Sequence, residues 1–316
     1  MNELTPNNCG LAKQVEALDW EELKIALNEC IVNKDQSILP EDYDAASYLP
    51  QKPENAEQEK LYTRAFDHGE QLIRAGKTAA FTVAGGQGTR LGYDGPKGTL
   101  PVSPIKKKPL FQLFAEQIRG ISEKYDVLIP WYIMCSPLNL EATFEHFKEN
   151  NFYELGEGEI KFFDQGVMPA TDFNGNLLLA NQDSLALSPN GHGGALKALI
   201  DSKSIADMAS RGVEHISYFQ VDNPLVSIIN PLFIGLHDLQ KSDMSSRSLT
   251  KTGPFEKLGN FVSVGDRITI IEYSDLPEEK ALEQELDGRI KYRAGSPAIH
   301  VLRRDFVEQF ASGEIR

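Results

Sequence analysis

The hydrophobic pattern from residue 78 onwards alternates short apolar runs with longer amphipathic segments. The apolar runs, which have the length and composition of buried strands, cover residues 78–84, 127–135, 160–163 and 214–221. Helices are predicted between them, over 109–125 and 138–150. Strands that alternate with helices form parallel sheets with right-handed crossovers. The pattern therefore predicts an α/β fold with a doubly wound and mostly parallel sheet.

The segments on either side of this alternation have different patterns. Two amphipathic helices, over 20–32 and 54–75, carry no evident chemistry, so residues 1–75 are predicted to form a helical N-terminal extension. It would pack on a catalytic domain formed by residues 76–316. The elements expected after the fourth strand are a helix over 231–240, a strand over 245–251, a hairpin over 260–273 turning at Gly265 and Asp266, a strand-like piece over 289–294, and a helix from about Asp305.

Composition narrows the class of protein. The chain has 316 residues, of which 32 are basic and 46 acidic, giving a net charge of −14. This balance argues against a general nucleic-acid binder, which would show a basic face. No apolar run is long enough to span a bilayer and no signal peptide is evident, so no membrane partner is expected. Three cysteines, odd in number and without metal-ligand spacing, favour a reducing cytosol.

A glycine-rich stretch follows the first strand and carries the strongest chemical signal. Gly85, Gly86 and Gly88 let the backbone approach a ligand closely, and their N–H groups can form a concave anion site. Arg90 and Lys97 supply positive charge for several phosphate oxygens. The stretch predicts a nucleoside triphosphate site at the carboxyl end of the first strand. The alternative is a simple tight turn.

Two better-known phosphate motifs do not fit this stretch. In the motif G-x-x-x-x-G-K-[ST], the lysine precedes a serine or threonine, but Lys97 precedes Gly98. In G-x-G-x-x-G read from Gly86, the third glycine would fall on Leu91. The lysine triplet at 106–108 is interpreted as a solvated loop.

A carboxylate after the fourth strand suggests a metal site. Asp222 follows the apolar run 214–221 and would emerge beside the glycine loop at the same edge of the sheet. Mg²⁺ prefers one or two carboxylates together with phosphate oxygens. The alternative is that Asp222 caps a turn, because Asp-Asn-Pro is common turn chemistry. At the end of the predicted hairpin, Glu272 and Tyr273 could contact a sugar hydroxyl.

Five blocks of sequence resemble the UDP-N-acetylhexosamine pyrophosphorylases, which belong with the UDP-glucose pyrophosphorylases. They occur in the family's order and read VAGGQGTRLG with PKG, PWYIM, FFDQG with MPA, VDN with NPLFIG, and IIEYS. The resemblance implies a Rossmann-like nucleotidyltransferase sheet and synthesis of a UDP-sugar and pyrophosphate from UTP and a sugar 1-phosphate, with Mg²⁺. UTP, sugar 1-phosphate, UDP-sugar and pyrophosphate are therefore the expected partners, and the oligomeric state stays open.

The resemblance also assigns nucleotide-binding residues. Ala84, Gly85 and Gly86 would hold the uridine together with Gln165, and Gly191 would line the nucleotide. Arg90 and Lys97 would hold the triphosphate.

The remaining assignments concern the metal and the sugar. By resemblance, Asp222 binds the metal, and Glu272 contacts the sugar together with Asn223 and Tyr273 of the matching blocks. His192 stands where the N-acetylhexosamine enzymes have Asn, and this resembles the GHG turn of the UDP-glucose enzymes. A histidine there could contact the sugar or could simply lie on the surface.

Two further departures bear on substrate and completeness. Ser296 replaces an Asn of the family near the sugar, which leaves glucose 1-phosphate and N-acetylglucosamine 1-phosphate equally plausible. The family continues past the equivalent of Arg316 with a phosphate-contacting lysine and a C-terminal domain, so a fragment or truncated product is expected.

Two rival functions stay open. One is a UDP-sugar-dependent glycosyltransferase, although such enzymes usually place their metal on Asp-x-Asp, whereas this chain has Asp222, Asn223 and Pro224. The other is a non-catalytic protein that binds UTP or a UDP-sugar.

Overall fold

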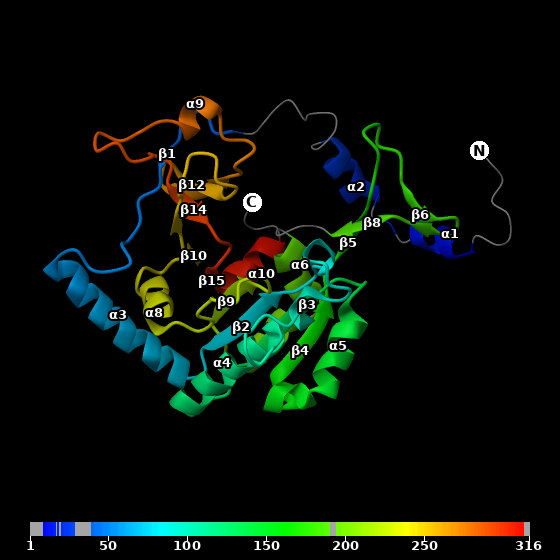
Figure 1. The fold of residues 1–316 in the computed structure, drawn as a ribbon, viewed down its shortest axis with the longest axis horizontal. Coiled ribbons are helices and arrows are strands. Elements are labelled where there is room, and N and C mark those ends of the chain that lie inside the picture. Colours follow the sequence, from blue (N-terminus) through cyan, green and yellow to red (C-terminus); the bar gives the residue numbers. More distant parts are fainter. Residues whose placement is uncertain (1–8, 17, 19, 29–38, 190–193, 313–316) are drawn as a thin grey trace.

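A six-stranded mixed sheet forms the centre of the protein (Figure 1). The computed structural model describes all residues except 1–8, 17, 19, 29–38, 190–193 and 313–316. In spatial order, the strands are β10 (Met244–Ser246), β15 (His300–Arg303), β9 (His215–Gln220), β2 (Thr78–Val83), β3 (Trp131–Cys135) and β4 (Ile160–Asp164). β9, β2, β3 and β4 run parallel, and β15 is antiparallel to both of its neighbours.

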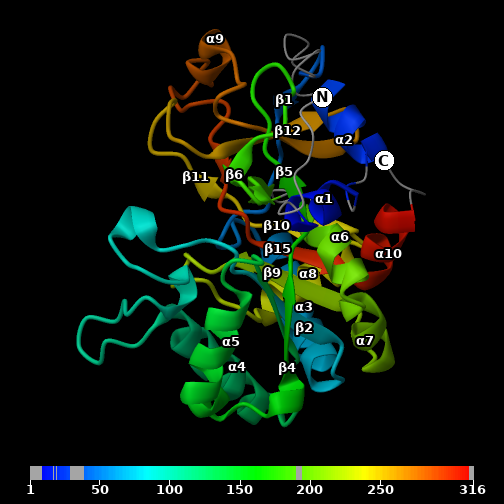
Figure 2. The ribbon, with the colours of Figure 1, turned by 90° about the vertical axis from the view of Figure 1, so that its right-hand side faces the viewer.

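Helices cover both faces of this sheet because its central strands are apolar on both sides. In β3, Trp131 and Ile133 pack on one face, and Tyr132 and Met134 pack on the other. The first face is covered by α3 (Ala56–Arg74), α4 (Leu110–Tyr125), α5 (Leu140–Glu149) and α8 (Pro231–Leu239). The second is covered by α6 (Gly194–Asp201), α7 (Ser204–Ser210) and α10 (Arg304–Ser312), as Figure 2 shows. The predicted α/β class is confirmed.

The order of the parallel strands reverses once, between β2 and β9. The chain moves outward from β2 to β3 and β4, and then returns to the other side of β2 as β9. In open α/β sheets, ligands bind where the strand order reverses, outside the carboxyl ends of the strands. The loops after β2 and β9 flank this point.

A second, antiparallel sheet lies above the first in Figure 1. Its strands are β1 (Asp44–Ala45), β11 (Leu249–Thr250), β12 (Gly259–Val264), β13 (Arg267–Ile271) and β14 (Ala294–Ser296). The predicted hairpin is confirmed, because β12 and β13 pair up to Val264 and Arg267 around Gly265, whose φ is 56°. Helix α9 (Glu278–Ala281) follows β13 in the sequence.

Two predicted strands are wrong. The strand expected over 245–251 is divided into β10 and β11, which belong to different sheets. The chain crosses from one sheet to the other there, and the N–H of Arg247 donates to the carbonyl of Ile299. The piece expected over 289–294 contains only the first residue of β14. Charged side chains pair locally before it, with Arg293 bound to Glu285 at 2.6 Å and Arg289 turned back to Asp287.

The first 75 residues contact three separate parts of the molecule. Helix α1 (Cys9–Glu16) lies against an arm formed by β5 (Val167–Pro169), β6 (Leu179–Asn181), β7 (Ser184–Leu185) and β8 (Leu187–Pro189). There, Gln14 accepts a hydrogen bond from the N–H of Leu185. β1 joins the second sheet, and α3 packs on α8. Helix α2 is described as Trp20–Leu27, and the domain boundary after residue 75 stays a prediction.

Helices α3 and α8 cross with their backbones almost in contact. A Cβ added to Gly69 would lie 1.9 Å from the carbonyl oxygen of Pro231. One added to Gly235 would lie 1.7 Å from that of Ala65. Only glycine permits this approach, which fixes α8 directly after the loop that follows β9.

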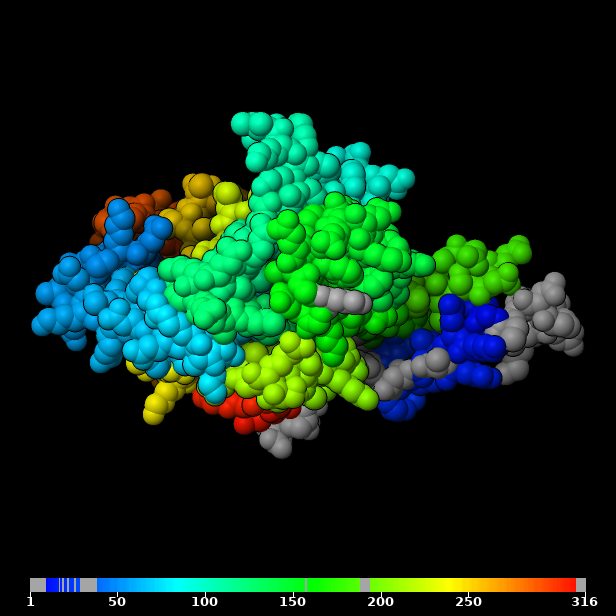
Figure 3. Space-filling model, turned by 90° about the horizontal axis from the view of Figure 1, so that it is seen from below, coloured from blue at the N-terminus to red at the C-terminus, as the bar shows by residue number. Residues whose placement is uncertain are grey.

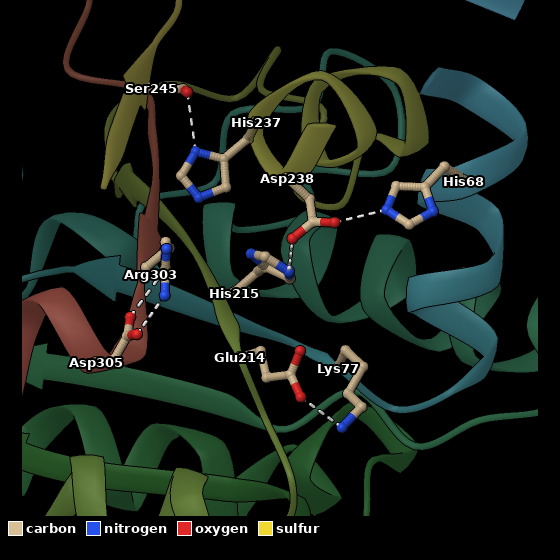
Figure 4. A network of polar contacts seen from close by, with 9 residues as sticks. All are labelled: His68, Lys77, Glu214, His215, His237, Asp238, Ser245, Arg303 and Asp305. Carbon is tan, nitrogen blue, oxygen red and sulfur yellow. Dashed lines mark hydrogen bonds and ion pairs between the residues drawn. The ribbon is translucent and has the colours of Figure 1, made fainter. Parts of the chain in front are cut away.

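Figure 4 shows a histidine network beside this crossing. His68 Nε2 lies 2.6 Å from Asp238 Oδ2, and His215 Nε2 lies 3.4 Å from Asp238 Oδ1. His237 Nδ1 lies 2.9 Å from Ser245 Oγ. His215 and His237 are buried, so their neutral forms are favoured. Burial, with the neighbouring His215 and Arg303, lowers the pKa of His237 to about 4.

This burial makes stability depend on pH. As the pH falls, the unfolded chain takes up a proton at His237 near pH 6.5, well before the folded chain does. The stabilising contribution is complete above about pH 6.5 and is lost as the pH falls toward the folded value. His237→Asn keeps a polar atom near Ser245 but does not titrate. Between about pH 7.5 and about pH 5, its free energy of unfolding should fall by roughly 2 kcal/mol less than that of the parent.

Urea titrations at the two pH values measure this difference. Ser245→Ala is the matched control, because it removes the hydrogen bond but leaves His237 titratable, and it should keep the pH dependence of the parent. Equal pH dependence of His237→Asn and the parent would contradict the assignment.

Candidate active site

The glycine-rich stretch forms a closed loop between β2 and a short 3-10 turn at Lys97–Thr99. The N–H of Lys97 donates to the carbonyl of Gly86, and the N–H of Gly88 donates to that of Gly95. Tyr93 packs on Gly88, where an added Cβ would lie 2.7 Å from Cδ1 of the ring. The glycines are therefore required by close packing as well as by turn geometry.

Gln165 reaches this loop from the far side of β3. It follows β4 directly, its N–H donates to the carbonyl of Cys135, and its side chain is buried. A Cβ on Gly85 would lie 3.2 Å from Gln165 Nε2. The structure thus brings together Gly85 and Gln165, which the sequence assigns to one nucleotide site.

Lys97 and Asp222 meet at the reversal of the strand order. Asp222 follows β9, and the N–H of Val221 before it donates to the carbonyl of Val83 at the end of β2. Lys97 Nζ lies 3.0 Å from Asp222 Oδ2, and a Cβ added to Gly86 would lie 3.6 Å from the same Nζ. The side chains are 24% and 47% exposed, so both remain accessible to a ligand.

Asn139 is part of this site and was missed by sequence reasoning. Its side chain is buried between β3 and α5, where Nδ2 donates to the carbonyls of Ala84 at 3.1 Å and Gly86 at 3.4 Å. Oδ1 accepts from the N–H and the hydroxyl of Ser136. The available signal was an asparagine immediately before a helix that follows a central strand.

Cys135 lies at the end of β3 and is buried. Burial raises the pKa of its thiol to about 12, which leaves it protonated at neutral pH. The thiol is thus no candidate nucleophile.

Arg90 and the sugar-side residues are not joined to this cluster. In the described part of the chain, no side-chain hydrogen bond or ion pair connects Arg90, Glu272 or Tyr273 with Asp222. Arg90 is exposed on the loop, and Glu272 and Tyr273 are exposed after β13 in the second sheet. Asn223 accepts from the N–H of Leu225 and so stabilises the turn after β9.

Two predicted residues, Gly191 and His192, lie outside the described residues. The helix expected from about residue 195 is present as α6 and begins at Gly194.

The lysine triplet forms part of a loop that stands out from the body of the molecule, seen as blue-green atoms at the top of Figure 3. Lys106 and Lys107 are exposed, and Lys108 pairs with Glu116 at 2.5 Å. This agrees with the interpretation as a solvated loop.

The donor set around Asp222 fits a metal that shares its ligands with phosphate. Within the described ranges, no group of three or more His, Cys, Asp and Glu side chains could hold a metal ion. A lone, half-exposed carboxylate suits Mg²⁺ only if phosphate oxygens and water complete the coordination, which is how Mg²⁺ is usually bound with nucleotides.

Among the helices that the structure describes, none combines the length and the apolar character needed to cross a bilayer.

Comparison with known proteins relates this geometry to a family. The family model described as UTP–glucose-1-phosphate uridylyltransferase (UDPGP) matches residues 17–292. UDP-N-acetylhexosamine pyrophosphorylase-like protein 1 of Homo sapiens is 37% identical over 248 residues, covering 77% of this chain and 49% of that protein. UDP-N-acetylglucosamine pyrophosphorylase of Saccharomyces cerevisiae is 34% identical over 259 residues, covering 81% and 54%.

A solved structure shows the same fold. The crystal structure of uridine diphosphate N-acetylglucosamine pyrophosphorylase from Trypanosoma brucei matches with a TM-score of 0.82 at 23% identity, covering 95% of this chain and 61% of that one. The chain spans about half the length of the curated relatives it matches. Because the family model matches most of its residues, the chain belongs to the UDPGP family of uridylyltransferases.

Proposed function

We propose that this chain transfers a uridylyl group from UTP to a sugar 1-phosphate, giving a UDP-sugar and pyrophosphate. The observation that carries the proposal is the Lys97–Asp222 contact beside the glycine loop, at the reversal of the strand order. At this position a lysine can bind phosphate oxygens directly, and a carboxylate can bind them through a cation. Gln165 against Gly85 adds a polar group where a base could be read.

The reaction proposed is an in-line displacement. A phosphate oxygen of the sugar 1-phosphate forms a bond to the α-phosphorus of UTP, and the bond from that phosphorus to the bridging oxygen of pyrophosphate breaks. The nucleophile is already an anion, so no general base is required. The work of the protein is to position two anions that repel each other and to stabilise the developing charge. Lys97 and Arg90 would bind the phosphates and the departing pyrophosphate.

Asp222 would have a different role. Its carboxylate would repel phosphates unless a cation lay between them. The single positive charge of Lys97 cannot neutralise both this carboxylate and a triphosphate. When bound, Mg²⁺ would supply charge neutralisation at the reacting phosphates. In this arrangement Asp222 orients the cation, while Lys97 keeps the carboxylate directed toward the glycine loop.

The names of the relatives support N-acetylglucosamine 1-phosphate as the first sugar to test, with glucose 1-phosphate as the second. The test is release of pyrophosphate from UTP and Mg²⁺ with each sugar phosphate. We expect release only when a sugar 1-phosphate is present. Binding of UTP without release would favour a non-catalytic binding protein, and consumption of a UDP-sugar without pyrophosphate would favour a glycosyltransferase.

The first prediction for the proposed function concerns the choice of nucleotide. If Gln165 and the backbone of residues 84–86 satisfy the uracil edge, UTP should bind at least about 100-fold more tightly than ATP or CTP, because other bases leave buried polar groups unpaired. Gln165→Ala should reduce this preference, whereas Thr89→Ala, exposed on the same loop, should not. Calorimetric dissociation constants measure both. Similar values for UTP and ATP would refute the assignment.

The second prediction concerns Lys97. Lys97→Ala removes a charged contact to phosphate from a loop outside the hydrophobic core, so the fold should persist. We expect a loss of about 100-fold or more in kcat/KM, as for removal of one electrostatic stabiliser. Binding of UTP should weaken while binding of uridine does not. Lys106→Ala, in the solvated loop, is the matched control and should behave like the parent.

The third prediction concerns Asp222. Asp222→Asn keeps the size and the turn geometry but removes the charge. If Asp222 orients Mg²⁺, the variant should fold normally, lose Mg²⁺-dependent pyrophosphate release and respond weakly to added Mg²⁺. Asp94→Asn, exposed in the neighbouring glycine loop, is the control. Parental Mg²⁺ dependence of the Asp222→Asn variant would show that this residue only caps a turn.

A further inference from the structure

Asn139 is the N-cap residue of α5, yet its side chain accepts no hydrogen bond from that helix. An asparagine at this position usually accepts a hydrogen bond from the first turn of its own helix. Here Oδ1 accepts from Ser136 instead, and Nδ2 donates to Ala84 and Gly86 in another loop. All of these partners lie outside α5. The side chain therefore forms its hydrogen bonds with the glycine loop and Ser136 and none with its own helix.

These contacts orient two peptide groups of the loop. In a trans peptide, the carbonyl and the N–H point in opposite directions. No peptide bond described in this structure is cis. The carbonyls of Ala84 and Gly86 are directed at Asn139, and that of Gly86 also accepts from the N–H of Lys97 at 3.0 Å. The N–H groups of Gly85 and Gln87 therefore point away from Asn139. The N–H of Gly85 belongs to the same peptide group as the carbonyl of Ala84, and the N–H of Gln87 to the same peptide group as the carbonyl of Gly86.

The opposite side of the loop is open. Gly86 and Gln87 are exposed, and Gly85 is half-buried. In the described residues, no hydrogen bond joins the N–H of Gly85 or of Gln87 to another group of the protein, whereas those of Gly88 and Lys97 are bonded within the loop. Two outward N–H groups on one small loop are suited to oxygen atoms of a bound ligand.

We infer that Asn139 is a positioning residue for the nucleotide, which holds the glycine loop with the N–H groups of Gly85 and Gln87 directed at the ligand. This inference rests on the proposed function. The residue itself is 1% exposed, so it acts through the loop and does not touch the nucleotide. A preset donor pair avoids the cost of ordering the loop on binding.

The chemistry of the side chain makes the role specific to an amide. Asn139 has one acceptor and one donor end, and both are used. An aspartate of the same shape could still accept from Ser136, but its second oxygen would face two carbonyl oxygens and repel them. The loop peptides would then lose the contact that orients them.

The experiment compares the parent with Asn139→Asp and Asn139→Ser. We expect the dissociation constant and the KM of UTP to rise roughly 10- to 100-fold, as for loss of buried hydrogen bonds. The KM of the sugar 1-phosphate should stay within about twofold, since no Asn139 contact reaches the second sheet. Hydrogen exchange at the Lys97 amide, which is bonded to Gly86, should accelerate.

Met208→Ala is the matched control. Met208 is fully buried on α7 and packs in the apolar cluster on the opposite face of the sheet from α5. The variant should lower the melting temperature, as the Asn139 variants do, but leave UTP affinity unchanged. Asn139→Ser keeps the test valid if the buried carboxylate of Asn139→Asp prevents folding.

The outcomes separate the two proposals. UTP affinity within about twofold of the parent in both Asn139 variants, with unchanged exchange at Lys97, would overturn the role of Asn139 and leave the proposed function intact. A parent that does not bind UTP would contradict the proposed function. In that case, the exchange rate at Lys97 alone would decide whether Asn139 holds the loop.

Discussion

Parallel pairing of β2 with both β3 and β9 is the constraint on which the site depends. It places the carboxyl ends of three strands side by side, so the loop after β2 lies between groups that follow the other two. Asn139 comes from the β3 side and Asp222 from the β9 side, while Gln165 arrives from β4, one strand further. Residues separated by more than a hundred positions therefore meet at one edge without any covalent link.

The contact between Lys97 and Asp222 matters more for geometry than for stability. Both side chains are partly exposed, and ion pairs of this kind contribute about 0–1 kcal/mol. Stability comes instead from the apolar layers on the two faces of the sheet, which include Phe111, Trp131 and Phe147 on one face and Phe81 and Tyr132 on the other. This division lets the charged edge remain open to ligands while the sheet beneath it stays rigid.

Close backbone contacts extend that rigidity to the segments around the sheet. The glycines of α3 and α8 bring the two helices together, and α8 begins shortly after Asp222. Gly98 has a comparable role under the loop, because an added Cβ would lie 2.1 Å from the ring of Phe111. The 3-10 turn that carries Lys97 therefore rests directly on α4. Small residues thus fix the positions of charged ones.

Local sequence patterns specify the α/β class, the central strands, the glycine loop and the residues after β4 and β9. These depend on local properties, namely apolar run length, glycine content and the rule that parallel strands end at one edge. Long-range contacts, by contrast, divide residues 244–250 between two sheets, direct the Asn139 side chain to the glycine loop instead of its own helix, and bring Lys97 to Asp222. Each of these outcomes is a non-local choice among partners, because a hydrogen-bond donor or a charge in a sequence does not specify which distant acceptor it will meet.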